Sequence, residues 1–308
     1  MVNITHLMPV KDGLPYLSTI LKAISENANK DDEVIIINDG SSDGTLYFLQ
    51  NNSFELPNLR VITTKGIGIV KALNLGLAES NNTWIARYDV DDVYTSKRIA
   101  TQRALISDKT AAIFCDYELI LQNGRSTGVI PSAVDNLATI VSLLFSQQTP
   151  HPAVIMNKDY VLAAGGYIFE DFPAEDLSLW LRMSRYGELI SSPEVLFKYR
   201  ISRTSTSGSR QNEVKNKKFH LLNYYGLPIE LIRENLNQLT ESFYNYGQLN
   251  FAHERKLLLK RNIHALHRIY PNINGISRIS YPSYALNHPI TTGKLFRQKM
   301  KRLIFRKS

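Results

Sequence analysis

Short apolar runs alternate with helical repeats over the first third of the chain. The run Glu33-Val-Ile-Ile-Ile37 is continuous and β-branched, which is typical of a strand buried on both faces of a sheet. Between such runs, apolar residues recur every three or four positions, the spacing of one helix face. This alternation predicts an α/β fold with a mostly parallel, Rossmann-like central sheet flanked by helices. Its ligand crevice is expected at the carboxyl ends of the strands.

The pattern predicts the following elements in chain order. Strands are expected over residues 3–8, 33–37, 60–63, 84–88 and 111–115, and helices over residues 17–24, 70–77 and 97–106. After Pro131 the spacing changes and predicts a helix over 134–145, a short apolar segment over 153–156, a helix over 177–186 and a strand over 195–199. Residues 204–210 are rich in Ser, Gly and Arg and are expected to form a mobile loop or a domain boundary.

Composition narrows the class of protein. Of the 308 residues, 44% are hydrophobic and 21% charged, which is enough apolar material for a substantial core. The single Cys115 excludes an internal disulfide and a Cys-rich zinc site. No run reaches the roughly 18 apolar residues of a membrane span, and none has the form of a cleaved signal. We therefore expect a cytoplasmic protein.

Positive charge is concentrated at one end of the chain. The net charge is +8, yet thirteen Lys and Arg and no Asp or Glu follow Glu254, so residues 1–254 carry a net charge of −5. From Lys294 to Lys307, seven Lys and Arg surround four apolar residues at helical spacing. Such a helix would bind an anionic membrane surface. A basic helix packed on the rest of the protein is the alternative, and nucleic-acid binding is not expected because no recognition motif accompanies the charge.

Two acidic motifs follow predicted strands. Asp39 ends a buried strand, where parallel sheets bind ligands, and can accept hydrogen bonds from a base or ribose, whereas Asp43 is expected to cap the next helix. Asp89, Asp91 and Asp92 lie within four residues directly after another strand. Crowded carboxylates repel one another unless a cation joins them, so this cluster is the candidate site for a divalent metal ion. A solvated acidic loop is the alternative.

A third pair of acids opens the helix expected near residue 177. Glu175 and Asp176 precede the amphipathic run Leu177-Ser-Leu-Trp-Leu-Arg-Met183. Acids in a first helical turn often serve only as caps or as partners of the helix dipole. Because this pair follows a nucleotide-type crevice and a metal-type cluster, it is also the candidate general base.

Together these motifs resemble family 2 glycosyltransferases with the GT-A fold. The pattern comprises Pro9-Val10-Lys11-Asp12, the IINDGSSDGT segment, GIGIVKALNLGLAESNNTWIARYDVDD, HPAVIM at residues 151–156, and AEDLSLWLRM followed by YRISRTSTS. Bacterial enzymes that extend O-antigen, capsule or exopolysaccharide show the strongest likeness. The resemblance implies a catalytic domain over residues 1–207, divided into a nucleotide-sugar half (1–115) and an acceptor half (116–207). Residues 208–308 would form a helical, basic C-terminal extension.

The resemblance also implies roles for residues. Asp39 would contact uracil, and Asp89 and Asp91 would be the DxD pair that contacts the ribose and holds Mn²⁺ or Mg²⁺, with Asp92 assisting. Asp176 would be the general base that deprotonates the acceptor hydroxyl, with Glu175 as second choice, and a single displacement would invert the anomeric centre. The further candidates for contact with the nucleotide sugar are Pro9, Asp12, Lys71, Arg200 and Arg203.

Several of these assignments have plain alternatives. Arg200 and Arg203 would clamp the diphosphate or belong to a solvated basic loop, and Lys71 would approach the phosphates or be an ordinary surface lysine. His151 fits the family's acceptor side but is equally a structural histidine. The chain departs from the family in having Asn38 for a second Asp, Lys11-Asp12 for Tyr-Asn, and no histidine near Ser205.

The sequence thus predicts an inverting, metal-dependent glycosyltransferase that uses a nucleotide sugar, preferably a UDP-sugar. The expected acceptor is a polyprenyl-diphosphate-linked glycan of bacterial surface polysaccharide (O-antigen, lipopolysaccharide or capsule), met at the inner face of the cytoplasmic membrane. The alternatives are a non-catalytic nucleotide- or sugar-binding protein on the same fold, and another nucleotide-dependent transferase. The donor sugar, the linkage and the oligomeric state are not assigned by the sequence.

Overall fold

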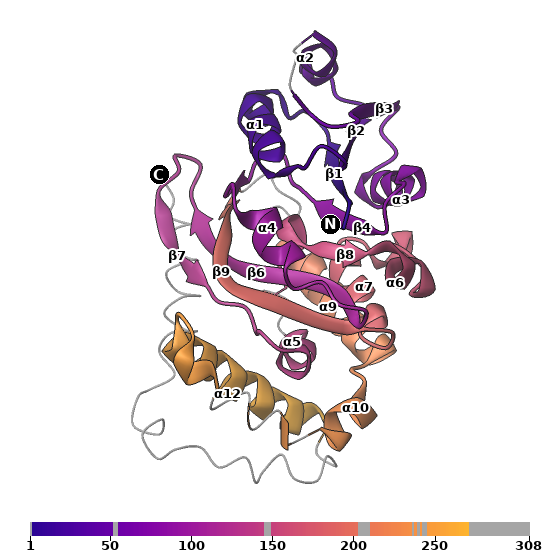
Figure 1. Cartoon of the computed structure of the whole chain (residues 1–308). Helices are drawn as coiled ribbons and strands as arrows, with labels where there is room; N and C mark the ends of the chain where they lie inside the picture. The colour runs from indigo at the N-terminus through magenta and orange to yellow at the C-terminus, as the bar shows by residue number, and fades with distance from the viewer. Residues whose placement is uncertain are drawn as a thin grey trace, which may run out of the picture.

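A curled central sheet organises the molecule (Figure 1). The computed structural model describes residues 2–51, 55–144, 149–202, 210–235 and 245–270, together with residues 237, 238 and 241. The sheet has nine strands in the order β3-β2-β1-β4-β8-β6-β9-β5, and β7 pairs with β6 outside this path. This is the α/β architecture that the sequence predicts.

The N-terminal half is a parallel β-α-β series. Its strands are β1 (Ile4–Val10), β2 (Glu33–Asp39), β3 (Arg60–Thr64) and β4 (Trp84–Arg87), and its helices are α1 (Leu17–Asn27), α2 (Thr45–Asn51) and α3 (Ile69–Glu79). All pairings among these strands are parallel, so their carboxyl ends meet at one edge, as expected. Helix α3 approaches β1 closely because Gly76 carries no side chain; a Cβ there would lie 2.2 Å from the Leu7 side chain.

The second half mixes strand directions. Its strands are β5 (Val93–Tyr94), β6 (Thr110–Ile120), β7 (Ser126–Ile130), β8 (Ile155–Asn157) and β9 (Glu188–Arg200). Strand β8 is antiparallel to both β4 and β6, whereas β9 runs parallel to β6. The helices are α4 (Arg98–Arg103), α5 (Asn136–Ser142), α6 (Lys158–Ala163) and α7 (Glu175–Met183), with short 3₁₀ helices η1 (Leu14–Tyr16), η2 (His151–Ala153) and η3 (Phe169–Asp171).

Several boundaries differ from the prediction. Strand β9 begins at Glu188, seven residues before the predicted start at residue 195. The prediction missed its first part because Ser191, Ser192 and Pro193 interrupt the apolar pattern there. The ladder with β6 shifts register at this point, between Cys115 and Asp116. Helix α7 spans 175–183 in place of 177–186, and α6, β5 and β7 were not predicted because each is short. Helix α2 is the helix expected after Asp43.

Two hydrophobic clusters cover the two faces of the sheet. One joins Leu7, Ile35 and Ile37 to residues of α3, α5 and α7, and the other joins Ile4, Met8 and Ile36 to residues of α1. Alternate residues of β1 and β2 therefore point to opposite faces, and both faces are buried.

The C-terminal helices pack on the second half. They are α9 (Gln211–Tyr225), α10 (Ile229–Glu234), the 3₁₀ helix η4 (Tyr246–Gln248) and α12 (Ala252–Ile269). Helix α9 packs on α7 and α12 packs on α5, and Leu221, Leu259 and Leu266 belong to the same hydrophobic cluster as those helices. The predicted basic helix over 294–307 lies outside the described residues. Within the described part of the chain, no helix is both long and apolar enough to cross a bilayer.

A buried ion pair fixes α12 to the sheet. The guanidinium of Arg255 donates to both carboxylate oxygens of Asp116 in β6, with Nη1 to Oδ1 at 3.0 Å. Its Nε donates to the Asn250 carbonyl at 2.9 Å. Both side chains of the pair are fully buried. The strand and the C-terminal extension therefore share one polar anchor inside a continuous core.

Candidate active site

Asp39 organises the loop that precedes α3. It is the last residue of β2, and its two carboxylate oxygens accept hydrogen bonds from the backbone amides of Ile67 at 2.7 Å and Gly68 at 2.9 Å. Burial raises the pKa of Asp39, but hydrogen bonds from the Thr64 hydroxyl and these amides outweigh it, so the pKa is lowered overall. The loop can approach closely because Gly40 has no Cβ; one there would lie 2.7 Å from the Gly66 amide nitrogen. Asp39 is therefore a charged acceptor at the carboxyl edge of the sheet.

The loop after β1 is joined to the loop after β2. Asp12, at a positive φ of 52°, accepts a hydrogen bond from the Ser42 amide at 2.7 Å. Asp43 accepts from the backbone amides of Leu14 at 2.9 Å and Thr45 at 3.0 Å, which confirms its predicted capping role at the start of α2. Pro9 is buried in β1 opposite Ile37 of β2. These contacts hold the loops after β1 and β2 together at the carboxyl edge of the sheet.

The acidic loop after β4 is built around Arg87. This guanidinium is buried and pairs with the Asp89 carboxylate at 2.5 Å. Its Nε and Nη1 atoms have no hydrogen-bond partner among the described residues. The Tyr94 hydroxyl accepts a hydrogen bond from the Asp89 amide at 2.8 Å and donates to the Pro152 carbonyl at 3.1 Å. The loop is thus held by a cation and a phenol that the sequence motifs did not single out.

The negative charge of Asp89 changes the pKa of both Asp91 and Asp92. Burial and the neighbouring Asp89 carboxylate raise the pKa of Asp91, and the same two causes raise the pKa of Asp92 further. The Asp92 Oδ1 atom accepts a hydrogen bond from the Arg200 amide at 2.7 Å, whereas its buried Oδ2 atom has no partner in the described part of the chain. A divalent cation would relieve this repulsion, and carboxylate oxygens are its preferred ligands.

The cluster fits a metal only with help from other ligands. Among the described residues, no three or more His, Cys, Asp or Glu side chains are arranged to hold a metal ion. Hard divalent ions commonly bind one or two carboxylates and complete their shell with substrate phosphates and water. Asp89, Asp91 and Asp92 suit that mode of binding.

Arg200 meets the acidic loop from the end of β9. Its Nε donates to the Asp91 carbonyl at 2.7 Å and its Nη1 to the Gln122 carbonyl at 3.0 Å. The guanidinium also lies over the Tyr16 ring, 5.5 Å from the centroid. Arg200 therefore joins the acidic loop to the β6–β7 connection and to η1. Arg203, its predicted companion, lies outside the described residues.

Glu175 and Asp176 begin α7, as predicted, but they have different surroundings. Burial and the Asp176 charge raise the pKa of Glu175 to about 7, and both Arg87 and Asp89 contribute to its electrostatic environment. The Asp176 carboxylate accepts a hydrogen bond from the Leu177 amide at 2.7 Å. The α7 pair and the acidic loop thus interact electrostatically across the site.

The remaining candidates lie around this pair. His151 is buried, with its Nε2 atom 2.7 Å from the Tyr167 hydroxyl, and burial lowers its pKa well below the usual value. This environment agrees with a structural histidine. Lys71 is exposed on α3, with its ammonium 5.4 Å from the centre of the exposed Phe169 ring.

Sequence reasoning missed Arg87, Tyr94 and Tyr167. Arg87 did carry a signal, because it is a charge at the end of an apolar strand directly before three acids. The tyrosines carried none, because their contacts join segments far apart in the chain.

Comparison with known proteins agrees with this geometry. Residues 5–132 match the model of the family described as glycosyl transferase family 2. An uncharacterized glycosyltransferase of Haemophilus influenzae is 28% identical over 239 residues, which cover 70% of this chain and 73% of that protein. The amylovoran biosynthesis glycosyltransferase AmsE of Erwinia amylovora is 25% identical over 189 residues, covering 60% of this chain and 70% of AmsE.

Solved structures share the fold at low sequence identity. S. aureus TarS 1-349 in complex with UDP-GlcNAc has a TM-score of 0.59 at 14% identity, covering 95% of this chain and 78% of that one. The mannosyltransferase PcManGT from Pyrobaculum calidifontis, in complex with GDP-Man and Mn²⁺, has a TM-score of 0.55 at 15% identity, covering 98% of this chain and 80% of that one. Both are GT-A type glycosyltransferases.

Proposed function

We propose that the chain, whose residues 5–132 match the glycosyl transferase family 2 model and whose fold is GT-A, is a member of that family and an inverting, metal-dependent enzyme that transfers a sugar from a UDP-sugar to a lipid-linked glycan. The observation that carries the proposal is that charged groups from the two halves of the fold act on one another: the charges of Arg87 and Asp89, at the end of β4 and on the loop after it, shift the pKa of Glu175 at the start of α7. A donor site and a base belong together in a transferase, whereas a binding protein needs no base.

The donor would lie along the carboxyl edge of the N-terminal strands. Asp39 is a charged acceptor there, and Asp12 shapes the adjoining loop. The UDP-GlcNAc of TarS and the GDP-Man of PcManGT support a nucleotide-sugar donor. We favour UDP because Asp39 can accept the ring N–H of uracil.

The acidic loop would hold the metal ion and the diphosphate. Asp91 and Asp89 are the proposed ligands of Mn²⁺ or Mg²⁺, with Asp92 assisting. When bound, the ion supplies Lewis-acid stabilisation of the departing nucleoside diphosphate. Arg200 positions the loop by bonding the Asp91 carbonyl, and the buried Arg87 adds positive charge beside it.

The α7 pair would take the proton. The acceptor hydroxyl oxygen attacks the anomeric carbon, the bond from that carbon to the diphosphate oxygen breaks, and the hydroxyl proton passes to the Asp176 carboxylate. Glu175, whose pKa burial and the Asp176 charge raise to about 7, would add a second negative charge beside Asp176 when it is ionised. One displacement at the anomeric carbon inverts its configuration.

The proposed acceptor is a polyprenyl-diphosphate-linked glycan of bacterial surface polysaccharide, at the inner face of the cytoplasmic membrane. The relation to AmsE, named for amylovoran biosynthesis, supports an exopolysaccharide, O-antigen or capsule role.

A transfer assay tests the proposal. The full chain is incubated with Mn²⁺, a panel of UDP-sugars and synthetic lipid-diphosphate glycans, and products are identified by mass spectrometry. We expect transfer by the wild type and by D108N, which changes an exposed carboxyl remote from the site. Transfer by D176N should be at least 10²-fold slower, the usual worth of a general base. Nucleotide binding without transfer or hydrolysis of any nucleotide sugar would instead indicate a non-catalytic protein.

A further inference from the structure

Helix α12 carries a stripe of basic side chains, some exposed and some half-buried. His253, Lys256, Lys260, His264, His267 and Arg268 recur at spacings of three and four residues. At about 100° per residue they fall within about 60° of His253 around the helix axis. The opposite side carries the buried residues Arg255, Leu259, Asn262 and Leu266. The stripe therefore lies on the side of the helix opposite its buried residues, with Lys256 and Lys260 half-buried and its other members exposed.

The stripe has one sign of charge. No Asp or Glu lies within it, since the only acid of α12, Glu254, is about 100° away around the axis. Burial and the charges of Lys260, Arg268 and His267 lower the pKa of His264, which shows that these groups act on one another. A solvated helix face normally mixes both signs, because opposite charges four residues apart stabilise the helix.

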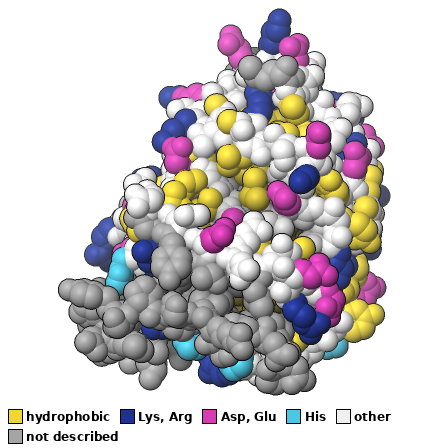
Figure 2. Space-filling model, turned by 60° about the horizontal axis from the view of Figure 1, so that its bottom comes forward, with side chains coloured by type: hydrophobic (Ala, Val, Ile, Leu, Met, Phe, Trp, Pro, Cys, Tyr) yellow, Lys and Arg dark blue, Asp and Glu magenta, His cyan; other side chains and the backbone are white. Residues whose placement is uncertain are grey.

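The position of the stripe suits a flat partner. Eighteen residues make a straight helix about 27 Å long. Figure 1 shows α12 at one end of the molecule and the N-terminal strands β1–β3 at the other. In Figure 2, in which the α12 end is turned forward, His side chains lie beside Lys and Arg side chains along the lower edge. A surface that covered α12 would leave the nucleotide half in solvent.

We propose that the basic face of α12 docks the protein on an anionic phospholipid surface. The apolar Leu257 lies inside the stripe at about 40° from His253, and cations around an apolar side chain are typical of helices at a membrane interface. The stripe holds no Phe, Tyr or Trp on which a nucleic-acid base could stack. The surface is separate from the donor site and does not depend on the identity of the sugar.

Vesicle binding by the full chain tests this surface. The probe is vesicles of phosphatidylglycerol and phosphatidylcholine, with pure phosphatidylcholine as the neutral arm. The variant K256Q/K260Q/R268Q is compared with K22Q/K30Q/K109Q, which removes the same charge from exposed lysines on other elements. Both sets are made in the native chain and in a chain whose seven Lys and Arg over 294–307 are replaced by Gln, so that those cations do not mask the effect.

Each cation near an anionic surface changes partitioning about fivefold. We expect the α12 variant to lose about 100-fold in partition coefficient in the second chain and the matched control to lose less than fivefold, with UDP affinity unchanged in both. Equal losses in the two variants would overturn the proposal, as would equal binding to neutral vesicles. Tighter binding of duplex RNA than of anionic vesicles at the same salt would assign the surface to nucleic acid.

Discussion

The roles proposed for Glu175 and Asp176 at the start of α7 can be distinguished by experiment. Glu175 has a pKa of about 7 because of burial and the Asp176 charge, so it ionises as the pH rises through neutrality. If the negative charge of ionised Glu175 assists proton transfer to the neighbouring Asp176 carboxylate, the kcat of the wild type increases several-fold between about pH 6 and pH 8. In E175Q this rise of kcat near pH 7 should be absent from the pH–rate profile, and kcat should stay within about tenfold of the wild-type value at pH 6. A pH–rate profile of both proteins measures this.

Two results would contradict that account. A limb near pH 7 that persists in E175Q would assign it to another group. A loss of 10²-fold or more at all pH values in E175Q would make Glu175 itself the base.

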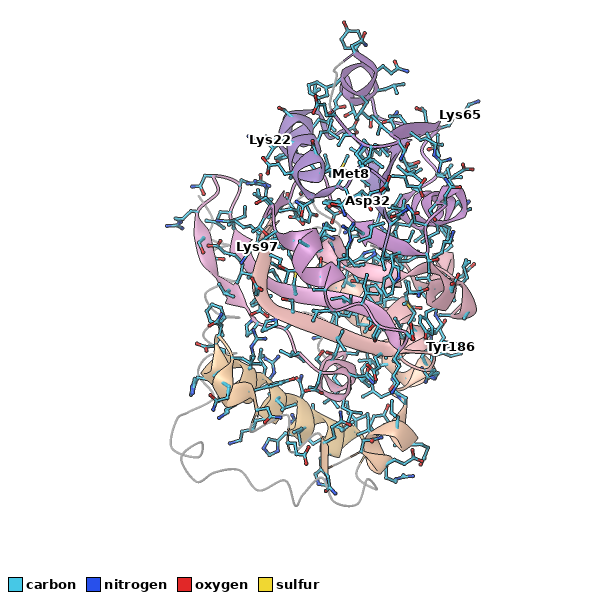
Figure 3. The ribbon with its side chains drawn as sticks, viewed as in Figure 1. Met8, Lys22, Asp32, Lys65, Lys97 and Tyr186 are labelled. Carbon is cyan, nitrogen blue, oxygen red and sulfur yellow. The ribbon has the colours of Figure 1, made fainter. Side chains whose placement is uncertain are left out.

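A buried network at the opposite edge of the sheet controls acid stability. Asp32, labelled between the N-terminal strands in Figure 3, contacts His6 at 3.3 Å and Arg103 at 2.7 Å. Burial alone raises the pKa of Asp32, but hydrogen bonds from His6, Asn29 and Ile4 outweigh it and bring the pKa from 3.8 to about 2. Folding therefore favours the carboxylate.

The resulting stabilisation is present in full above about pH 4 and is lost as the pH falls through about 2. Its size is about 2 kcal/mol. Urea unfolding of the wild type, D32N and the exposed-site control D108N between pH 5 and pH 2.5 measures it. We expect the wild type and D108N to lose stability alike, and D32N to lack about 1.5 kcal/mol of that loss, the part of the Asp32 contribution that disappears between these pH values. Parallel curves for all three proteins would show that Asp32 does not titrate with folding.

At the scale of elements, the buried ion pair between Arg255 and Asp116 holds α12 against β6. Removal of one partner leaves a charge without compensation in the core, which typically costs 3–5 kcal/mol. R255M should therefore lose about that much free energy of unfolding, because Asp116 remains buried and charged. The double variant D116N/R255M should recover part of the loss, as measured by urea unfolding. A double variant no more stable than R255M would show that the packing of Arg255 matters more than its charge.

The elements also show where sequence reasoning succeeds. Strands β1, β2 and β4 are buried along their whole length, and the continuous apolar run in β2 made that strand visible in the sequence. The first part of β9 was missed because Ser191, Ser192 and Pro193 break that pattern, and the strand is held there by its long pairing with β6. The local sequence does not encode a pairing between residues about 75 positions apart.

The residues of the candidate site also fall into those that the sequence predicted and those that it did not. Asp39, Asp89, Asp91 and the α7 pair were predicted because each follows a strand or opens a helix. The network that holds them was not predicted, because Arg87, Tyr94 and Arg200 act through carbonyls and carboxylates brought close only by the fold. The sequence shows that a charged residue lies at the end of a strand, but it does not show which residues will contact that side chain in the fold.

At the scale of the whole molecule, the residues of the proposed donor site and the proposed base come from two halves of one sheet. The N-terminal half supplies Asp39 and the acidic loop, and the second half supplies α7 and Arg200. Helices α9 and α12 continue the core of the second half, so that the C-terminal residues described here pack as part of the catalytic fold. The α12 stripe lies at the end remote from β1–β3 (Figure 1).

Calorimetric titration of UDP into the full chain tests the central claim most directly. Three samples are compared: wild type with Mn²⁺, wild type with EDTA, and D91A with Mn²⁺. We predict binding in the first sample only, since the diphosphate needs both the metal ion and its Asp91 ligand. Equal UDP affinity in all three samples would contradict the assignment of the acidic loop as the metal and diphosphate site.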